Sequence, residues 1–218
     1  MGVTGVDVTR VDVLGAERAA GRCDVSPAPD HPERIANPLV LVRHGHAGER
    51  WADQVADRGR PLDARGRDQA AGLPGSLASA IGGHRLPQAM LVSSPTTRCV
   101  GTLEPLAEAY DRELTTDERL AEVEPPLPSR DGWPDAAWLG ARAMAVVDEL
   151  TKTHPGAPVI VCSHGEILPA LVATVVARQG RRVPPSLDLT RKAVPKGSAW
   201  VLAAASGSVE WIAASDGG

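Results

Sequence analysis

The chain has 218 residues, of which 43% are hydrophobic and 23% are charged, a composition typical of a protein with one principal folded core. Its formal net charge of −4 excludes a general attraction to nucleic acid or anionic membranes, so any preference for phosphate has to come from a local site. No stretch is long and apolar enough to span a bilayer, and the three cysteines form no even set for a disulfide framework. We therefore expect a cytoplasmic protein with reduced thiols.

The first part of the chain differs in composition from the rest. Valines that recur between positions 6 and 13 indicate a short strand, whereas the proline-rich run at positions 26–32 is typical of an extended linker. We predict a flexible tail over residues 1–37, with a strand docked on the surface as the alternative. Residues 38–218 are predicted to form one domain.

Predicted strands and helices alternate from residue 38 onward. The predicted strands cover 39–43, 89–93, 113–116, 158–162, 198–204 and 208–213. The predicted helices cover 66–81, 96–110, 135–153 and 165–179, with a polar loop at 48–63 and a proline-rich loop at 123–134. This alternation predicts an α/β fold with three layers, α/β/α, around a mainly parallel central sheet.

The first strand of this domain ends in Arg43, His44 and Gly45. In an open α/β sheet, ligands bind just outside the carboxyl ends of the parallel strands. Arginine presents a planar pair of donors to phosphate oxygens, neutral imidazole is a nucleophile, and glycine lets the backbone turn close to a ligand. The three residues together suit a phosphate site, but for the tripeptide alone a histidine packed in the turn between strand and loop is the favoured alternative.

Two later segments are predicted to reach the same edge of the sheet. The strand at 158–162 is followed by Ser163 and His164, which places a second histidine after a buried strand. The strand at 89–93 leads into a helix for which we expect Ser94 as the N-cap, with Arg98 in the first turn. Two histidines and two arginines are therefore expected to meet.

These segments closely resemble the histidine phosphatase superfamily, also called the phosphoglycerate mutase-like family, over roughly residue 38 to the C-terminus. The likeness is carried by the Arg43-His44-Gly45 motif, the Ser94 to Arg98 segment and the Ser163-His164-Gly165 motif. Within the superfamily the sequence is most similar to a short branch that includes SixA-type phosphohistidine phosphatases and the phosphatase half of actinobacterial Nudix fusions.

The resemblance implies a role for each matching residue. His44 would be the nucleophile that becomes phosphohistidine, and Arg43, Arg98 and His164 would hold the phosphate, with Gly45 at the turn. Glu122 matches the position of the proton donor, and Glu124, two residues later, is the alternative.

Other charged residues are weaker candidates for substrate contact. His46 and Arg50 follow the first motif, and both are candidates to touch the substrate; a solvated loop residue is the alternative for each. Arg60 is a further candidate for a second phosphate of a nucleotide, and Lys196 for an approach to the pocket, although both are equally compatible with a charged surface.

The resulting prediction is a phosphohydrolase that works through phosphohistidine on a phosphomonoester, a phosphoprotein or a nucleotide, without nucleic-acid or membrane partners. No histidine and cysteine spacing resembles a zinc site, so we expect neither a metal nor a cofactor. The alternatives are a phosphoglycerate mutase-type phosphotransferase and a non-catalytic phosphate-binding module. The sequence His46-Ala47-Gly48 departs from the mutase pattern, and few insertions separate Arg98 from His164, which predicts an open pocket without a large cap.

Overall fold

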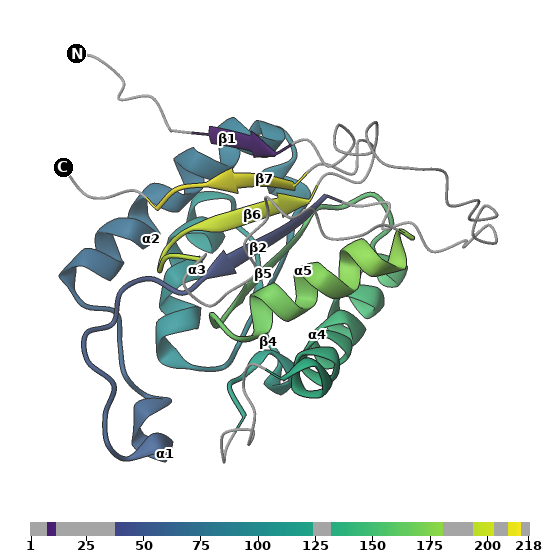
Figure 1. The fold of residues 1–218 in the computed structure, drawn as a ribbon. Coiled ribbons are helices and arrows are strands. Elements are labelled where there is room, and N and C mark those ends of the chain that lie inside the picture. The colour runs from purple at the N-terminus through teal and green to yellow at the C-terminus, as the bar shows by residue number, and fades with distance from the viewer. Residues whose placement is uncertain (1–7, 12–37, 124–131, 181–193, 203–208, 215–218) are drawn as a thin grey trace.

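A seven-stranded sheet in the order β1-β7-β6-β2-β5-β3-β4 forms the centre of the molecule (Figure 1). The computed structural model describes residues 8–11, 38–123, 132–180, 194–202 and 209–214. The strands are β1 (Val8–Val11), β2 (Leu39–Arg43), β3 (Met90–Ser93), β4 (Leu114–Thr116), β5 (Val159–Ser163), β6 (Ala199–Leu202) and β7 (Val209–Ile212). Strands β2, β5, β3 and β4 are parallel to one another, whereas β6, β7 and β1 extend the sheet beyond β2 in antiparallel pairs.

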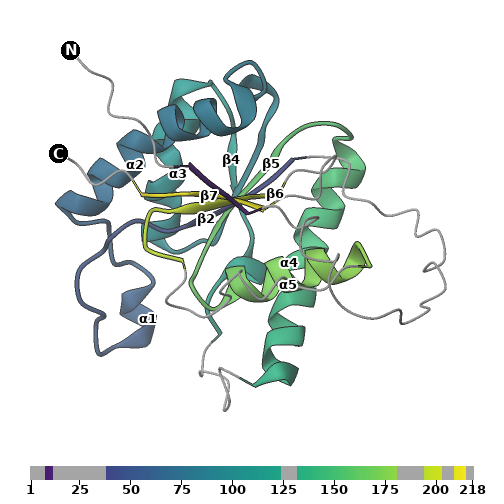
Figure 2. The ribbon, with the colours of Figure 1, turned by 45° about the horizontal axis from the view of Figure 1, so that its top comes forward.

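Helices cover both faces of the sheet, which confirms the predicted three-layer architecture (Figure 2). The helices are α1 (Gln54–Asp57), α2 (Ala64–Leu77), α3 (Thr97–Ala109), α4 (Trp133–Thr153) and α5 (Ile167–Arg178). Helices α2 and α3 pack together on one face, and α4 and α5 pack together on the other. The parallel half of the sheet carries the motifs that the sequence singled out.

The side chains of β2 show why this segment is a continuous apolar run. Leu39 and Leu41 pack into the core beneath α4 and α5, whereas Val40 and Val42 pack into the core beneath α2 and α3. All four are completely buried. A strand covered on both faces has no solvent side, so every position is apolar, and each such side chain contributes about 1.5–3 kcal/mol of transfer free energy.

The starts of two helices are fixed by local capping, and one of them corrects a prediction. Asp63 caps α2, because its side chain accepts a hydrogen bond from the Gly66 backbone N–H at 2.9 Å. The N-cap of α3 is Thr96, so the assignment of this role to Ser94 was wrong. Ser94 instead lies against His164, and Arg98 still falls in the first turn of the helix.

Two further segments differ from a plain reading of the sequence. The loop predicted at 48–63 contains the short helix α1, whose N-cap Asp53 accepts hydrogen bonds from two backbone N–H groups. Near the amino terminus, Val8–Val11 forms β1 and pairs with β7, the strand that the sequence allowed as an alternative to a tail. The rest of residues 1–37 lies outside the described residues, and the division at residue 38 stays a prediction.

Helices long and apolar enough to cross a membrane are absent from the part of the chain that the structure describes.

Candidate active site

Three adjacent parallel strands end side by side at one edge of the sheet. The residue that follows each strand is His44 after β2, His164 after β5 and Ser94 after β3. The strand register places these ends level, since Arg43 pairs with Ser163. The rings of His44 and His164 consequently meet edge to face, with their centroids 5.3 Å apart.

His44 has the tautomer and the charge of a nucleophile. Its Nδ1 lies 2.8 Å from the carbonyl oxygen of Gly45, and because a carbonyl only accepts, the proton resides on Nδ1 and the lone pair on Nε2. Burial lowers the pKa of His44 to about 3, and the neighbouring His164 and Arg98 act in the same direction. The imidazole is therefore neutral at neutral pH, with only 6% of the residue exposed.

Two glycines hold the loop after β2 against helix α2. A Cβ atom on Gly66 would lie 1.9 Å from the carbonyl oxygen of His46, and one on Gly45 would lie 2.9 Å from the carbonyl oxygen of Gly66. The backbone N–H of Gly45 donates to Thr102 Oγ1 at 2.9 Å, which ties the same loop to α3. Gly45 thus shapes the loop, and its N–H already has a protein acceptor.

His164 lies deeper than His44, with 1% of its surface exposed. Its Nε2 is 2.9 Å from Ser94 Oγ and 3.6 Å from Cys99 Sγ. Its Nδ1 is buried without a hydrogen-bond partner, 3.8 Å from the carboxylate of Glu122. A buried polar nitrogen of this kind costs free energy unless it meets a ligand, so it is a candidate contact for a phosphate oxygen.

Arg98 is held rigidly at the centre of the cluster. One guanidinium nitrogen, Nη1, donates to the carbonyl oxygen of Asp57 at 2.8 Å, and Nη2 donates to Glu122 Oε2 at 2.6 Å. Its Nε is buried without a partner, and only 2% of the residue is exposed. Arg98 thus presents a buried, unpaired donor at the centre of the cluster.

Arg43 approaches from the end of β2 and packs against the second histidine motif. Its Nη1 donates to the carbonyl oxygen of Val194. A Cβ atom on Gly165 would lie 2.8 Å from the central carbon of the guanidinium, so the glycine after His164 leaves room for this arginine.

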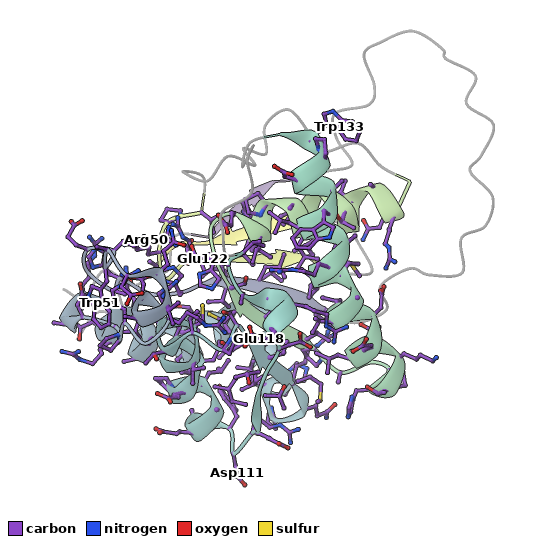
Figure 3. The ribbon with its side chains drawn as sticks, turned by 90° about the horizontal axis from the view of Figure 1, so that it is seen from below. Arg50, Trp51, Asp111, Glu118, Glu122 and Trp133 are labelled. Atoms are coloured by element: carbon purple, nitrogen blue, oxygen red, sulfur yellow. The ribbon has the colours of Figure 1, made fainter. Side chains whose placement is uncertain are left out.

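Glu122 lies among the positive groups of the cluster. Its Oε2 accepts from Arg98 and, at 3.3 Å, from Arg50 Nη2, and Figure 3 shows Arg50 and Glu122 beside each other. Burial, the largest single influence, raises its pKa, but the combined charges of His164, Arg98 and Arg50 outweigh it, so that the net shift is downward. The carboxylate is ionised and is paired with the guanidinium group of Arg98. The alternative acid, Glu124, lies outside the described residues.

The remaining candidates are placed around this centre. The imidazole of His46 contacts the carboxylate of Asp63, and its backbone N–H donates to Gln69. Arg60 is buried and donates to Asp57 at 2.7 Å and to the carbonyl oxygen of Ala47 at 2.6 Å, so it braces the loop and is occupied within the protein. That placement argues against a contact between Arg60 and a second phosphate.

Sequence reasoning missed the contact between Ser94 and His164, as well as the buried pair of Asp57 and Arg60. The pair carries a visible signal, since opposite charges three residues apart can meet across the turn that follows α1. The serine carries none, because its partner lies 70 residues away. Within the described ranges, no three histidine, cysteine, aspartate or glutamate side chains form a group able to hold a metal ion.

A buried neutral imidazole close to the guanidinium group of Arg98, at the carboxyl edge of an α/β sheet, is an arrangement suited to binding and attacking a phosphoryl group. Residues 39–126 match the family model of the histidine phosphatase superfamily (branch 1), and the chain belongs to this superfamily. The resemblance stated from the sequence is confirmed.

Named relatives agree with this assignment. A curated 8-oxo-(d)GTP phosphatase of Mycolicibacterium smegmatis is 33% identical over 171 residues, which cover 78% of this chain and 45% of the relative. The chain therefore spans less than half the length of that relative.

Among solved structures, a mycobacterial glucosyl-3-phosphoglycerate phosphatase in complex with VO3 is similar, with a TM-score of 0.56 and 22% identity over 77% of this chain and 91% of the other. A putative phosphohistidine phosphatase SixA of Agrobacterium tumefaciens is similar with a TM-score of 0.51 and 16% identity, over 77% of this chain and 91% of the other. At these identities the two structures support the fold.

Proposed function

We propose that the protein is a metal-independent phosphohydrolase that works through a phosphohistidine on His44. The observation that carries this proposal is the neutral, buried imidazole, whose Nδ1 proton is fixed by Gly45 and whose Nε2 is left as the nucleophile. Nε2 attacks the phosphorus atom, a P–N bond forms, and the bond to the leaving oxygen breaks. Water then attacks the phosphohistidine, which releases phosphate and restores the imidazole.

Hydrogen-bond donors around His44 stabilise the transferred phosphoryl group. Arg98, Arg43 and His164 are the donors for its three equatorial oxygens, and two of these residues carry buried nitrogens without a partner. Loss of one such donor costs on the order of 2.7–4 kcal/mol of transition-state stabilisation in comparable sites. All three side chains are positioned by the protein before substrate binds, so little reorganisation is needed.

Glu122 is proposed as the general acid for the leaving oxygen and then as the general base for water. In the free protein it is an ionised partner of Arg98. A phosphate dianion that binds Arg98 replaces this carboxylate as its partner and places negative charge beside it. Both changes raise the pKa of Glu122, which favours the protonated acid in the complex.

The proposed substrates are phosphorylated small molecules. The names of two relatives describe a phosphatase for a nucleotide and a phosphatase for a phosphorylated sugar acid. A phosphoprotein substrate and a mutase reaction are the competing possibilities, and they are separated by a substrate panel and by analysis of product isomers.

The test is hydrolysis of an aryl phosphate by wild type and His44→Ala, with His84→Ala as the matched control because His84 is exposed and distant in sequence from both motifs. Wild type and the control should release phosphate at equal rates and yield an acid-labile phosphoprotein after rapid quenching, with or without a metal chelator. His44→Ala should give neither product. Equal phosphate release by His44→Ala and wild type would refute the proposal.

A further inference from the structure

A cavity of about 370 Å³ lies beside the catalytic cluster. Its lining residues come from the loop after β2, from α2, from the turn before β6 and from the segment after β7: His46, Arg65, Gln69, Pro195, Lys196, Ala213 and Ala214. The volume is at the lower end of the range found for small-molecule sites. It suits one chemical group of a substrate better than a protein segment.

The strand register puts this cavity at the same edge of the sheet as His44. Strand β6 is antiparallel to β2, with Ala199 opposite Val42, so the turn that precedes β6 lies where β2 ends. Strand β7 ends beside the start of β6, with Ile212 opposite Ala199. Strands β5 and β3 lie on one side of β2, and β6 and β7 lie on the other (Figure 1). His164 follows β5 and Arg98 lies in the helix after β3, whereas the cavity is lined by residues before β6 and after β7.

The turn that carries Lys196 is attached to the catalytic loop. The backbone N–H of Gly197 lies 3.1 Å from the carbonyl oxygens of Arg43 and His44. Gly197 has a φ of +78°, and a Cβ atom there would lie 2.8 Å from the side-chain amide of Gln69, so a residue with a side chain is excluded on both grounds. The position of Lys196 relative to the nucleophile is therefore fixed by the backbone.

The electrostatic surroundings of Lys196 favour an anion. Burial lowers its pKa, and the positive charges of Arg43 and Arg60 lower it further, against the opposing effect of Asp63 and Glu49. The ammonium group thus lies in a region where positive charge exceeds negative charge. Arg65 adds a second cation to the lining, and none of the lining residues that the structure describes is acidic.

We propose that this cavity binds a second anionic group of the substrate, a phosphate or a carboxylate, while the phosphoryl group to be transferred lies at His44. Lys196 is the main specificity-determining residue, and Arg65 supports it. The inference rests on the proposed function and narrows its substrate class: molecules with two anionic groups are preferred over simple phosphomonoesters.

The experiment compares matched substrates in wild type and Lys196→Gln. ADP against AMP tests a second phosphate, and 3-phosphoglycerate against glycerol 3-phosphate tests a second carboxylate. The measured quantity is the ratio of kcat/KM within each pair, so any loss common to both members cancels. Loss of one charge-assisted hydrogen bond is expected to lower one of these ratios roughly tenfold.

Two further variants complete the design. Arg65→Gln should lower the same ratio by a smaller factor. Lys152→Gln is the matched control, because Lys152 is an exposed lysine at the end of α4 and should leave both ratios at the wild-type value. The pair whose ratio falls identifies the second anion as phosphate or carboxylate, and two ratios unchanged in Lys196→Gln would overturn the inference.

A failure of the proposed function would give a different result from a failure of the inference about the cavity. If wild type hydrolysed neither the aryl phosphate nor any of these four substrates, the phosphohydrolase would be refuted. Equilibrium binding of inorganic pyrophosphate relative to inorganic phosphate would then test the cavity without turnover. Lys196→Gln should weaken the binding of pyrophosphate about tenfold more than the binding of phosphate. Equal weakening of the two ligands would overturn the inference in that case as well.

Discussion

Replacement of Glu122 by glutamine tests the proposed proton transfer. The amide oxygen of glutamine can still accept from Arg98 Nη2, which lies 2.6 Å from the present carboxylate, so the local contact survives while the proton donor is lost. The variant should therefore fold normally. Because the negative charge beside Arg98 and His164 disappears, phosphate should bind at least as tightly as in wild type.

The size of the effect depends on the leaving group. General acid catalysis contributes about 10²- to 10⁴-fold, and this corresponds to about 2.7–5.4 kcal/mol. We expect kcat/KM, which reports the steps up to departure of the leaving group, to fall by at least about 10²-fold for an alkyl phosphate, whose leaving oxygen needs a proton. For a nitrophenyl phosphate, whose leaving oxygen is stable as an anion, the loss should stay below about tenfold.

The assay is steady-state phosphate release with both substrates, and Glu118→Gln is the matched control. Glu118 lies on the exposed surface four residues upstream and pairs with Arg58 at 2.7 Å, so its loss should change neither rate. An equal loss of kcat/KM for the two leaving groups in Glu122→Gln would refute the assignment of the acid. Glu124→Gln, measured in parallel, would then show whether the second carboxylate has this role.

Three further predictions concern the scaffold. Gly66→Ala should lower the free energy of unfolding by about 1–3 kcal/mol, since the new Cβ would lie 1.9 Å from a carbonyl oxygen. Gly75→Ala, in the same helix, meets no atom within 4 Å and should raise the free energy of unfolding by up to about 1 kcal/mol. Urea denaturation measures both variants, and a loss of stability in Gly75→Ala would contradict the steric argument. Arg60→Met should cost about 3–5 kcal/mol in the same assay, because it leaves Asp57 buried without its main cation, and a loss below about 1 kcal/mol would show that the pair is dispensable. The third concerns pH: the folded pKa of His44 is about 3 against 6.5 in the unfolded chain, so the unfolded state takes up the extra proton and stability falls as the pH drops through this window. Between about pH 6 and pH 4 the free energy of unfolding of wild type should fall by about 1.4 kcal/mol per unit more steeply than that of His44→Gln, and parallel slopes would contradict the buried neutral imidazole.

Much of the fold could be predicted because its signals are local. The apolar run of β2 and its abrupt end at Arg43 are visible in the sequence, and the structure confirms the strand at Leu39–Arg43. The cap of α2 at Asp63 was equally visible, since a capping side chain acts within three residues. Helix α1 was missed because four residues in a polar loop give too short a periodic pattern to detect.

The candidate site could be predicted as a set of residues but only partly as a set of contacts. Parallel strands present their carboxyl ends at one edge, so two histidines that each follow a buried strand had to approach one another. The partner of each side chain was less predictable. Ser94 was expected to cap a helix and instead contacts His164, because the paths of two loops decide which groups meet.

The sequence by itself thus determined the strands, the order of the helices and the two histidine motifs, because hydrophobic periodicity and strand ends depend on neighbouring residues. Only the tertiary structure decided that Glu122 reaches Arg98 and that Lys196 lines a cavity next to the nucleophile. The physical reason is separation along the chain: Lys196 is 152 positions after His44, and only the pairing of β6 with β2 brings them together.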